Sequence, residues 1–184
     1  LRAGIKDGDV VVIQGAGTMG LVTLAAVAEY TNPAEIIVAA KYSHQKELAR
    51  SLGATTVVSP SEMKRAVRRH VGCRMIGDDL TGGADVTIDA VGSASSIADS
   101  ISVTRPRGRV LLLGMPGVTK LDLTPLWHRE TELVGAYTYC TEHLDDGTHT
   151  TSFTMAFDLV AKAKLDRLVS AHYPISEYKA ALRH

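Results

Sequence analysis

The chain has few of the features that mark secreted, membrane or nucleic-acid-binding proteins. Its 184 residues include only two cysteines, Cys73 and Cys140, which stand far apart and form no CxxC pair. Disulfide scaffolds and zinc knuckles need clustered cysteines, so we interpret both as free thiols of a protein in the reducing cytoplasm. No apolar run reaches the ~20 residues of a membrane span, and the first residues show no signal-peptide pattern. We therefore predict no membrane partner.

An excess of charge of one sign is also lacking. Twenty basic and 20 acidic residues cancel, and aromatic residues make up only 5% of the chain. No overall field therefore draws the protein to nucleic acid. One basic cluster contains Lys64, Arg65, Arg68, Arg69 and His70, without interleaved aromatic residues that could stack on bases. We interpret this cluster as the water-facing side of a helix and predict no nucleic-acid partner.

A glycine-rich turn is the most informative feature that the chain does have. The segment Gly15–Gly20 (GAGTMG) follows the apolar run Val10–Ile13 and opens a helical pattern at Leu21–Tyr30. Strand, glycine turn and helix are the context of the dinucleotide fingerprint. Its three glycines would permit the tight turn, the approach of a pyrophosphate, and close packing of helix on strand, while the helix N-terminus faces the phosphates. The cofactor contacts predicted here are Gly15, Gly17, Thr18, Met19 and Gly20.

Apolar strand patterns alternate with helical patterns along the whole chain. The strand patterns are almost uniformly apolar, as expected for strands that helices cover on both faces. We therefore predict an α/β fold: a Rossmann-type, doubly wound parallel sheet in three layers, with right-handed crossovers. The predicted strands are Asp9–Gln14, Glu35–Ala40, Thr55–Val58, Asp85–Ala90, Arg109–Gly114 and Glu132–Tyr139, with a weaker candidate at Val169–Tyr173.

Helices are predicted between these strands from apolar residues at helical spacing and from capping residues. Gly53 is a candidate C-cap for one helix, and serines precede two others. The predicted helices are Leu21–Tyr30, Leu48–Leu52, Glu62–Val71 (capped by Ser59 or Ser61), Ile97–Thr104 (capped by Ser93 or Ser95) and a stretch that contains Met155, Leu159 and Val160.

The whole chain, residues 1–184, is predicted to be one nicotinamide-dinucleotide-binding domain. Leu1–Gly4 reads like the tail of a preceding helix, and Ser176–Leu182 like a capped helix that is cut short. We therefore expect a domain taken from a longer protein.

Two polar stretches, Gly72–Ala84 and Thr141–Thr151, are predicted to be loops. The second carries His143 and His149 beside the acidic pair Asp145–Asp146, a combination that could bind a metal. No two of these ligands have helical or knuckle spacing, so we favour a solvated loop and predict no metal site.

Ligands of open parallel sheets bind outside the carboxyl ends of the strands, where the strand order reverses. That rule nominates four loops: the glycine turn, the loop after Ala40, and the loops that close the two later strands. Glycines in the last two loops would let a flat ring lie against bare backbone. The contacts predicted from these two loops are Val91, Gly92, Leu113, Gly114 and Met115.

The loop after the second strand departs from the NAD pattern. A carboxylate usually ends this strand and binds the ribose hydroxyls, but Ala40 stands here. A 2′-phosphate would instead meet Lys41, Ser43 and His44, and a charge pair in contact near a protein surface is worth up to ~4 kcal/mol before desolvation. We therefore predict NADP in preference to NAD, with all four residues in the site. The alternative is that Lys41 faces solvent and Tyr42 stacks on the adenine.

With these landmarks placed, the chain resembles the cofactor domain of the zinc-type, medium-chain alcohol dehydrogenases over nearly its whole length. Ile5–Val12 is similar to the lead-in strand of that family, and Gly15–Leu21 is similar to its fingerprint. Leu48–Ala54 resembles the following helix and turn, while Gly83–Gly92 and Gly108–Gly114 resemble the two later strands. This ordered set is more specific than the glycines alone.

The resemblance implies a parent enzyme that passes a hydride between NADP(H) or NAD(H) and an alcohol or polyol, with a small-molecule alcohol or carbonyl compound as substrate. A catalytic zinc would polarise the substrate oxygen. The family's zinc ligands lie in a separate catalytic domain, and Cys73 and Cys140 match none of their positions. We therefore assign no catalytic or metal residue here and expect this chain to be inactive by itself.

The resemblance also implies contacts near the last predicted strand of the sheet. Ala136 and Tyr137 resemble the family segment whose backbone meets the nicotinamide carboxamide. In the family this edge strand often pairs across a dimer, and an unpaired apolar edge needs such a cover. Leu133–Tyr139 therefore predicts a homodimer or tetramer.

Three alternative functions use a similar fold. Zinc-independent quinone reductases usually carry an Ala-x-x-Gly-x-x-Gly turn, and Gly15 and Gly17 argue against them. A non-catalytic module that senses dinucleotide needs no zinc domain, so the flanking sequence of the parent gene would distinguish it. Methyltransferases normally place an acidic residue after the second strand, where this chain has Ala40.

Overall fold

The architecture comes from a computed structural model, which describes residues 2–144 and 147–183. Six parallel strands form one sheet in the order β3-β2-β1-β6-β7-β8. The order runs outward from β1 in one direction and continues from β6 in the other, which is the doubly wound Rossmann arrangement. The predicted fold class is therefore confirmed. The strands are β1 (Val10–Gln14), β2 (Glu35–Ala39), β3 (Thr56–Val58), β6 (Ala84–Asp89), β7 (Thr104–Leu112) and β8 (Glu132–Gly135).

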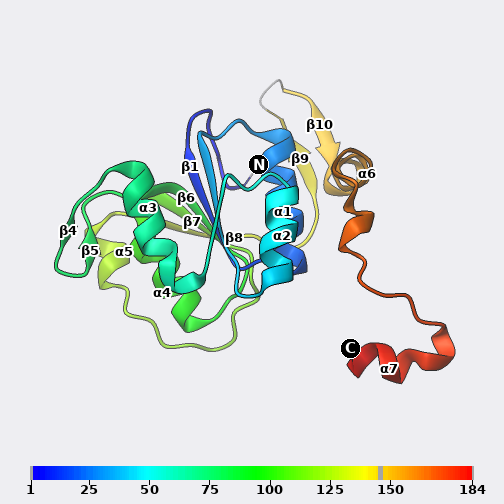
Figure 1. Ribbon diagram of the computed structural model, residues 1–184. Coiled ribbons are helices and arrows are strands. Elements are labelled where there is room, and N and C mark those ends of the chain that lie inside the picture. The colour runs from blue at the N-terminus through cyan, green and yellow to red at the C-terminus, as the bar shows by residue number, and fades with distance from the viewer. Residues whose placement is uncertain (1, 145–146, 184) are drawn as a thin grey trace.

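Helices cover both faces of this sheet, as Figure 1 shows. They are α1 (Thr18–Tyr30), α2 (Ser43–Ser51), α3 (Met63–Val71), α4 (Ala94–Val103), α5 (Thr124–His128) and α6 (Ser152–Ala163). On the face of α1, α2 and α6, Leu24 joins Val11 and Ile13 of β1 in a buried cluster. On the face of α3 and α4, Val67 packs with Val12. Successive β1 residues thus point to opposite faces and fill two separate cores, as the pleat requires.

Short sequence signals set several helix ends. Ser93 precedes α4, and its Oγ accepts a hydrogen bond from the backbone N–H of Ser96 (3.1 Å), so this predicted cap is confirmed. Gly53 follows α2 with a φ of 104°, a left-handed conformation that stops the helix. Ser59 instead caps a 3-10 turn, Pro60–Glu62, which leads into α3.

The basic cluster lies on α3. The buried residues of this helix are Met63, Ala66 and Val67, while Arg65, Arg68, Arg69 and His70 are exposed. The cluster is therefore the solvent-facing side of an amphipathic helix, as the sequence predicted.

Two strands predicted near the C-terminal end are wrong. One is shorter than predicted, and the other is not a strand of the described chain. The strand predicted at Glu132–Tyr139 ends at Gly135, and the chain then turns, with Thr138 at a φ of 54°. The weak candidate Val169–Tyr173 is not a strand of the described chain, and it follows a 3-10 helix, η2 (Leu165–Leu168). The apolar pattern of this segment led to a wrong prediction, because its side chains are not buried against the sheet.

The boundary between α4 and β7 is also misplaced in the sequence prediction. β7 begins at Thr104 rather than at Arg109, because Thr104 pairs with Ala84 across a register shift. The helix predicted as Ile97–Thr104 therefore ends one residue earlier, at Val103.

Each of the two predicted loops contains a short antiparallel hairpin. In the first, β4 (Met75–Ile76) pairs with β5 (Asp79–Leu80), and in the second, β9 (Thr141–His143) pairs with β10 (His149–Thr151). The acidic pair Asp145–Asp146, candidate metal ligands in the sequence, lies outside the described residues.

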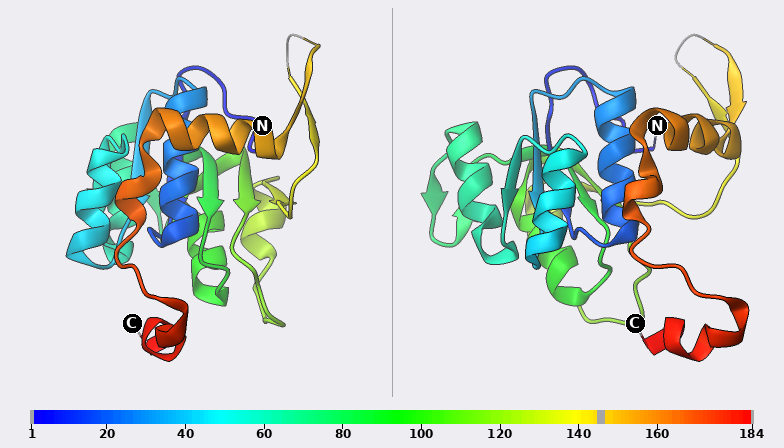
Figure 2. Two further views of the ribbon diagram at one scale, coloured as in Figure 1. Left: turned by 90° about the vertical axis from the view of Figure 1, so that its right-hand side faces the viewer. Right: turned by 45° about the vertical axis from the view of Figure 1, so that its right-hand side comes forward.

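Beyond α6 the chain leaves the layered body. A 3-10 helix, η3 (Ile175–Glu177), leads into α7 (Tyr178–Arg183), which stands apart from the sheet and its covering helices in Figure 2. The helix expected near Ser176–Leu182 is therefore present. Across the described residues, no helix is both long and apolar enough to cross a membrane.

Candidate dinucleotide-binding site

The loops nominated from the sequence lie together along one edge of the sheet. In a parallel sheet all carboxyl ends meet at the same edge, and here the first residue after each of β1, β2, β6, β7 and β8 bonds to the end of a neighbouring strand. The backbone N–H donors and their carbonyl acceptors are Gly15 to Ala39 (3.1 Å), Ala40 to Val58 (2.9 Å), Ala90 to Gln14 (2.9 Å), Leu113 to Asp89 (2.9 Å) and Ala136 to Leu112 (3.0 Å). The candidate site is therefore one continuous border rather than a set of separate loops.

The three glycines of the turn have three different surroundings. Gly15 has a φ of 97°, and a Cβ there would lie 2.5 Å from Cγ2 of Val91, so the tight turn requires glycine. A Cβ on Gly20 would collide with the carbonyl oxygen of Gly15, because α1 packs directly on the turn. At Gly17, no heavy atom lies within 4 Å of the Cβ position. Gly17 is therefore the glycine of the turn with open space beside it, and the fingerprint predicts that a pyrophosphate binds there.

The N-terminus of α1 offers hydrogen-bond donors at this opening. Gly17 is the N-cap, no side chain caps the helix, and no acidic residue lies in its first turn. Thr18 and Met19 are exposed beside it. The first backbone N–H groups of a helix have no intrahelical acceptor, so an anion at this position satisfies them and interacts favourably with the helix dipole.

An unsatisfied acceptor lies directly before the turn. Gln14 is 5% exposed, and its Oε1 has no hydrogen-bond partner among the described residues. A buried polar atom without a partner is costly, and such atoms in native sites usually meet a ligand or a water. Free donors at the N-terminus of α1 and the opening at Gly17 together fit the diphosphate of a dinucleotide.

The loop after β2 and the start of α2 present Lys41, Ser43 and His44. Ala40 is 0% exposed, so its side chain lies beneath the loop, where a cofactor could not touch it. Lys41, Ser43 and His44 are exposed. The Lys41 ammonium lies 5.3 Å from the centre of the Tyr42 ring, and the His44 ring is stacked with the same tyrosine at 5.8 Å. The loop therefore holds positive charge against an aromatic surface at a helix N-terminus.

The loops after β6 and β7 touch each other through bare backbone. A Cβ on Gly92 would lie 2.9 Å from the backbone of Gly114 and Met115, and a Cβ on Gly114 would collide with the amide of Gly92. Val91 is 49% exposed and Met115 is 90% exposed. The two loops thus form a joint rim whose apolar side chains face solvent.

At the far end of the border, Ala136 is half-buried and Tyr137 is exposed. The carbonyl oxygen of Tyr137 accepts a hydrogen bond from Nη1 of Arg2 (3.3 Å). All the residues predicted as cofactor contacts therefore stand on one edge, although Ala40, Gly20 and Gly92 are buried within it.

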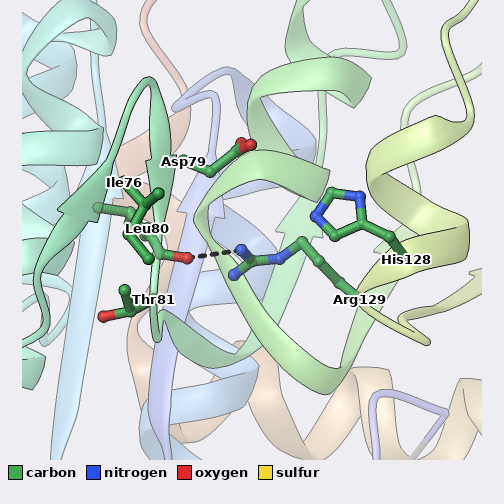
Figure 3. A pocket seen from close by; sticks show the side chains of 6 residues that line it. All are labelled: Ile76, Asp79, Leu80, Thr81, His128 and Arg129. Carbon is green, nitrogen blue, oxygen red and sulfur yellow. Dashed lines mark hydrogen bonds between the residues drawn. The ribbon is translucent and has the colours of Figure 1, made fainter.

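Two cavities lie away from this edge, and neither contains a predicted contact. One, of about 650 Å³, lies between α1, α6 and the segment Arg2–Lys6. The other, of about 230 Å³, is shown in Figure 3, where Arg129 reaches toward the carbonyl of Leu80 (Nη1 to O, 2.6 Å). Arg129 is 4% exposed, and desolvation lowers its pKa from the ordinary value. Because its guanidinium also bonds to the carbonyls of Gly82 and Thr104, it fixes backbone rather than facing a ligand.

Residues capable of binding metal are dispersed. The described part of the chain contains no group of three or more His, Cys, Asp or Glu side chains arranged to hold a metal ion. The rings of His143 and His149 meet edge to face at 4.4 Å across the β9–β10 hairpin.

Both cysteines are free thiols. The Sγ of Cys140 donates a hydrogen bond to Oε1 of Glu142 (3.1 Å), and this bond is the main cause that lowers the pKa of Glu142.

With fold and edge described, comparison with known proteins decides the family. Residues 18–162 match the family model described as zinc-binding dehydrogenase. The chain belongs to the zinc-binding dehydrogenases. The match, the Rossmann sheet and the glycine turn together identify a dinucleotide-binding domain of this family.

Individual relatives agree with that assignment. Human sorbitol dehydrogenase (Homo sapiens) is 31% identical over 147 residues, which cover 76% of this chain and 38% of that protein. The crystal structure of L-idonate 5-dehydrogenase from Escherichia coli superimposes with a TM-score of 0.75 at 27% identity, covering 99% of this chain and 48% of that one. A zinc-binding dehydrogenase from Sinorhizobium meliloti bound to NADP shares the fold, with a TM-score of 0.67 at 24% identity and coverage of 92% and 46%. This zinc-binding dehydrogenase chain thus spans less than half the length of these relatives, whose named members are oxidoreductases.

Sequence reasoning missed two side chains of the edge. The unpaired carboxamide of Gln14 gave no signal, because a polar residue before a glycine turn is ordinary. Asp89 could have been found: an acidic residue ends an apolar strand and precedes Val91–Gly92, a spacing typical of side chains that accept from their own following backbone.

Proposed function

We propose that residues 1–184 are the cofactor domain of a longer zinc-binding dehydrogenase and bind a nicotinamide dinucleotide along the carboxyl edge of the sheet. The main observation behind this proposal is the open space at the Cβ position of Gly17, beside the N-terminus of α1. No side chain caps that N-terminus. A diphosphate there would accept from the first N–H groups of α1.

The loop Lys41–His44 favours NADP over NAD. No carboxylate ends β2 to bind the ribose hydroxyls, and Lys41 and His44 would meet a 2′-phosphate. The fold itself accommodates NADP, since the relative from Sinorhizobium meliloti binds it. The stacking of Lys41 and His44 with Tyr42 would keep both near one position and reduce the entropy lost on binding.

The whole enzyme would act on an alcohol or polyol, as the names of its relatives indicate. The bound cofactor supplies the hydride acceptor, while the chain's own edge residues hold it against Val91, Gly92 and Leu113–Met115. A zinc that polarises the substrate oxygen would be bound outside this chain. The chain alone would therefore bind cofactor without turnover.

The assembly proposed for this enzyme is a homodimer or tetramer in the cytoplasm. β8 is the last strand of the sheet, so its outer edge is free to pair with a second copy, and Leu133 on it is 37% exposed. Free thiols at Cys73 and Cys140 suit a reducing compartment.

Substituting Lys41 tests the cofactor preference. We expect the 184-residue chain to bind NADPH more tightly than NADH in fluorescence titrations. Lys41→Ala should weaken NADPH about tenfold, which equals ~1.4 kcal/mol, by removing a cation from the 2′-phosphate, and should leave NADH unchanged.

The matched control for this experiment is Lys179→Ala on α7, since Lys179 also lies over a neighbouring tyrosine ring, that of Tyr178, at 6.0 Å. This control should bind like the wild type. Tighter NADH binding, or equal losses for the two cofactors in Lys41→Ala, would overturn the preference for NADP.

A further inference from the structure

A buried carboxylate stands in the middle of the cofactor edge. Asp89 is the last residue of β6 and is 0% exposed, between Gln14 of β1 and Leu112 of β7. Neither the glycine turn nor any predicted contact includes it. Its position at the centre of the border raises the question of what its charge does there.

The carboxylate fixes the loop after its own strand. Oδ1 accepts from the backbone N–H groups of Val91 (2.8 Å) and Gly92 (3.2 Å), and Oδ2 accepts from the hydroxyl of Ser96 (3.0 Å). These bonds hold the first loop residues and the start of α4 in one arrangement. Charge-assisted hydrogen bonds of this kind are the stronger ones in proteins.

The backbone of the same residue fixes the next loop. The carbonyl oxygen of Asp89 accepts from Leu113 (2.9 Å) and Gly114 (2.8 Å). Because Gly92 and Gly114 are in backbone contact, one residue anchors both loops of the joint rim. A shift of Asp89 would therefore move Val91, Gly92 and Leu113–Met115 together.

Hydrogen bonding explains part of the need for a carboxylate at this position. An asparagine oxygen could accept from Val91 and Gly92, but its amide nitrogen could not accept from the Ser96 hydroxyl as Oδ2 does. Among the described residues, no basic side chain forms an ion pair with Asp89. Three hydrogen-bond donors and the N-terminus of α4 stabilise the negative charge, but no cation of the described residues neutralises it, so its field still reaches the rim.

We propose that Asp89 is a positioning residue for the rim formed by Val91, Gly92 and Leu113–Met115, and that its charge selects the oxidised cofactor over the reduced one. This inference rests on the proposed function. An oxidised nicotinamide ring carries a positive charge that the reduced ring lacks, while the rest of the cofactor is the same in both forms. A fixed negative charge beneath the rim therefore favours the oxidised form.

The test compares NADP⁺ and NADPH affinities of the full 184-residue chain by calorimetry. Asp89→Asn keeps an acceptor for Val91 and Gly92 but removes the charge, so NADPH affinity should stay within about twofold while NADP⁺ binds about fivefold more weakly. Asp89→Ala releases the loops and should weaken both forms. The control Thr87→Val alters another buried polar residue of β6, whose hydroxyl accepts from Thr104, and should leave the ratio unchanged.

A second readout needs no cofactor. In the free protein, the amides of Val91 and Gly92 should exchange with solvent slowly in the wild type and in Asp89→Asn, and faster in Asp89→Ala. An unchanged NADP⁺ to NADPH ratio in Asp89→Asn would overturn the selection by charge. Wild-type exchange in Asp89→Ala would overturn the positioning role. Failure of the wild type to bind either form would overturn the proposed function itself, and with it this inference.

Discussion

Gly17 and Gly20 belong to the same turn, yet they face different neighbours. Gly17 has an extended backbone (φ −73°, ψ −175°) and open space at its Cβ position, so other residues fit there without strain. Gly20 is buried, and a Cβ on it would collide with the carbonyl of Gly15. One glycine therefore keeps a site open, and the other keeps the helix packed on the strand.

This difference predicts opposite effects of two substitutions. Gly17→Val should fold normally, because no heavy atom lies close to the Cβ position of Gly17. It should lose cofactor binding, because the valine side chain would fill the space where the diphosphate is proposed to bind. Gly20→Ala should lower the free energy of unfolding by about 1–3 kcal/mol through overpacking against Gly15. Urea titration and NADPH fluorescence measure the two effects. Wild-type affinity in Gly17→Val would remove the glycine turn from the site.

Residues that carry a motif could be predicted from the sequence, and residues that act through contacts could not. The conformations of Gly15 and the cap at Ser93 follow from local rules that need no partner. The importance of Gln14 and Asp89 depends on which strands lie beside them, a long-range fact that a single sequence does not contain.

At the scale of elements, α6 is held to α1 by polar contacts at its solvent side. The Tyr30 hydroxyl of α1 donates to Oδ2 of Asp158 (2.9 Å). Within α6, Lys162 forms an ion pair with the same carboxylate (3.0 Å), and it also pairs with Glu29 of α1 (3.6 Å). Hydrogen bonds from Lys162 and Tyr30 lower the pKa of Asp158 below its ordinary value. Leu159, also on α6, is buried in the core cluster that α6 shares with α1.

The lowered pKa of Asp158 predicts a pH-dependent contribution to stability. A carboxyl group whose pKa is lower in the folded than in the unfolded state stabilises the fold above its unfolded pKa, about 4, and loses this effect as pH falls through the folded value. Asp158→Asn should therefore have a lower urea midpoint than the wild type at pH 6, and the gap should close at acid pH. A gap that persists unchanged at acid pH would contradict the role of this carboxylate.

Elements of the central sheet could be predicted because their strands are buried on both faces and read as apolar runs. The strands at the margins could not, since an apolar pattern does not say whether a partner surface exists. The end of β8 at Gly135 and the absence of a strand at Val169–Tyr173 are both errors of this kind. The hairpins β4–β5 and β9–β10 have strands of only two and three residues, too short to show an alternating pattern, and so they resembled loops.

At the scale of the whole molecule, the chain brings all the predicted cofactor contacts to one edge but spans less than half the length of a related dehydrogenase. The order β3-β2-β1-β6-β7-β8 brings the carboxyl ends of six parallel strands to one border, with the glycine turn and the loop after β6 at its centre. Among the described residues there is no cluster of metal ligands to activate a substrate. The proposed function therefore assigns cofactor binding to this chain and the zinc chemistry to the rest of the enzyme.

The most direct test of the cofactor edge is an NMR titration of the 184-residue chain with NADPH, followed through backbone amide shifts. The account predicts saturable shifts at Gly15–Gly20, Lys41–His44, Val91–Gly92 and Leu113–Met115, and small changes on α7. Shifts confined to the cavity between α1 and α6, or no shifts at millimolar NADPH, would contradict it.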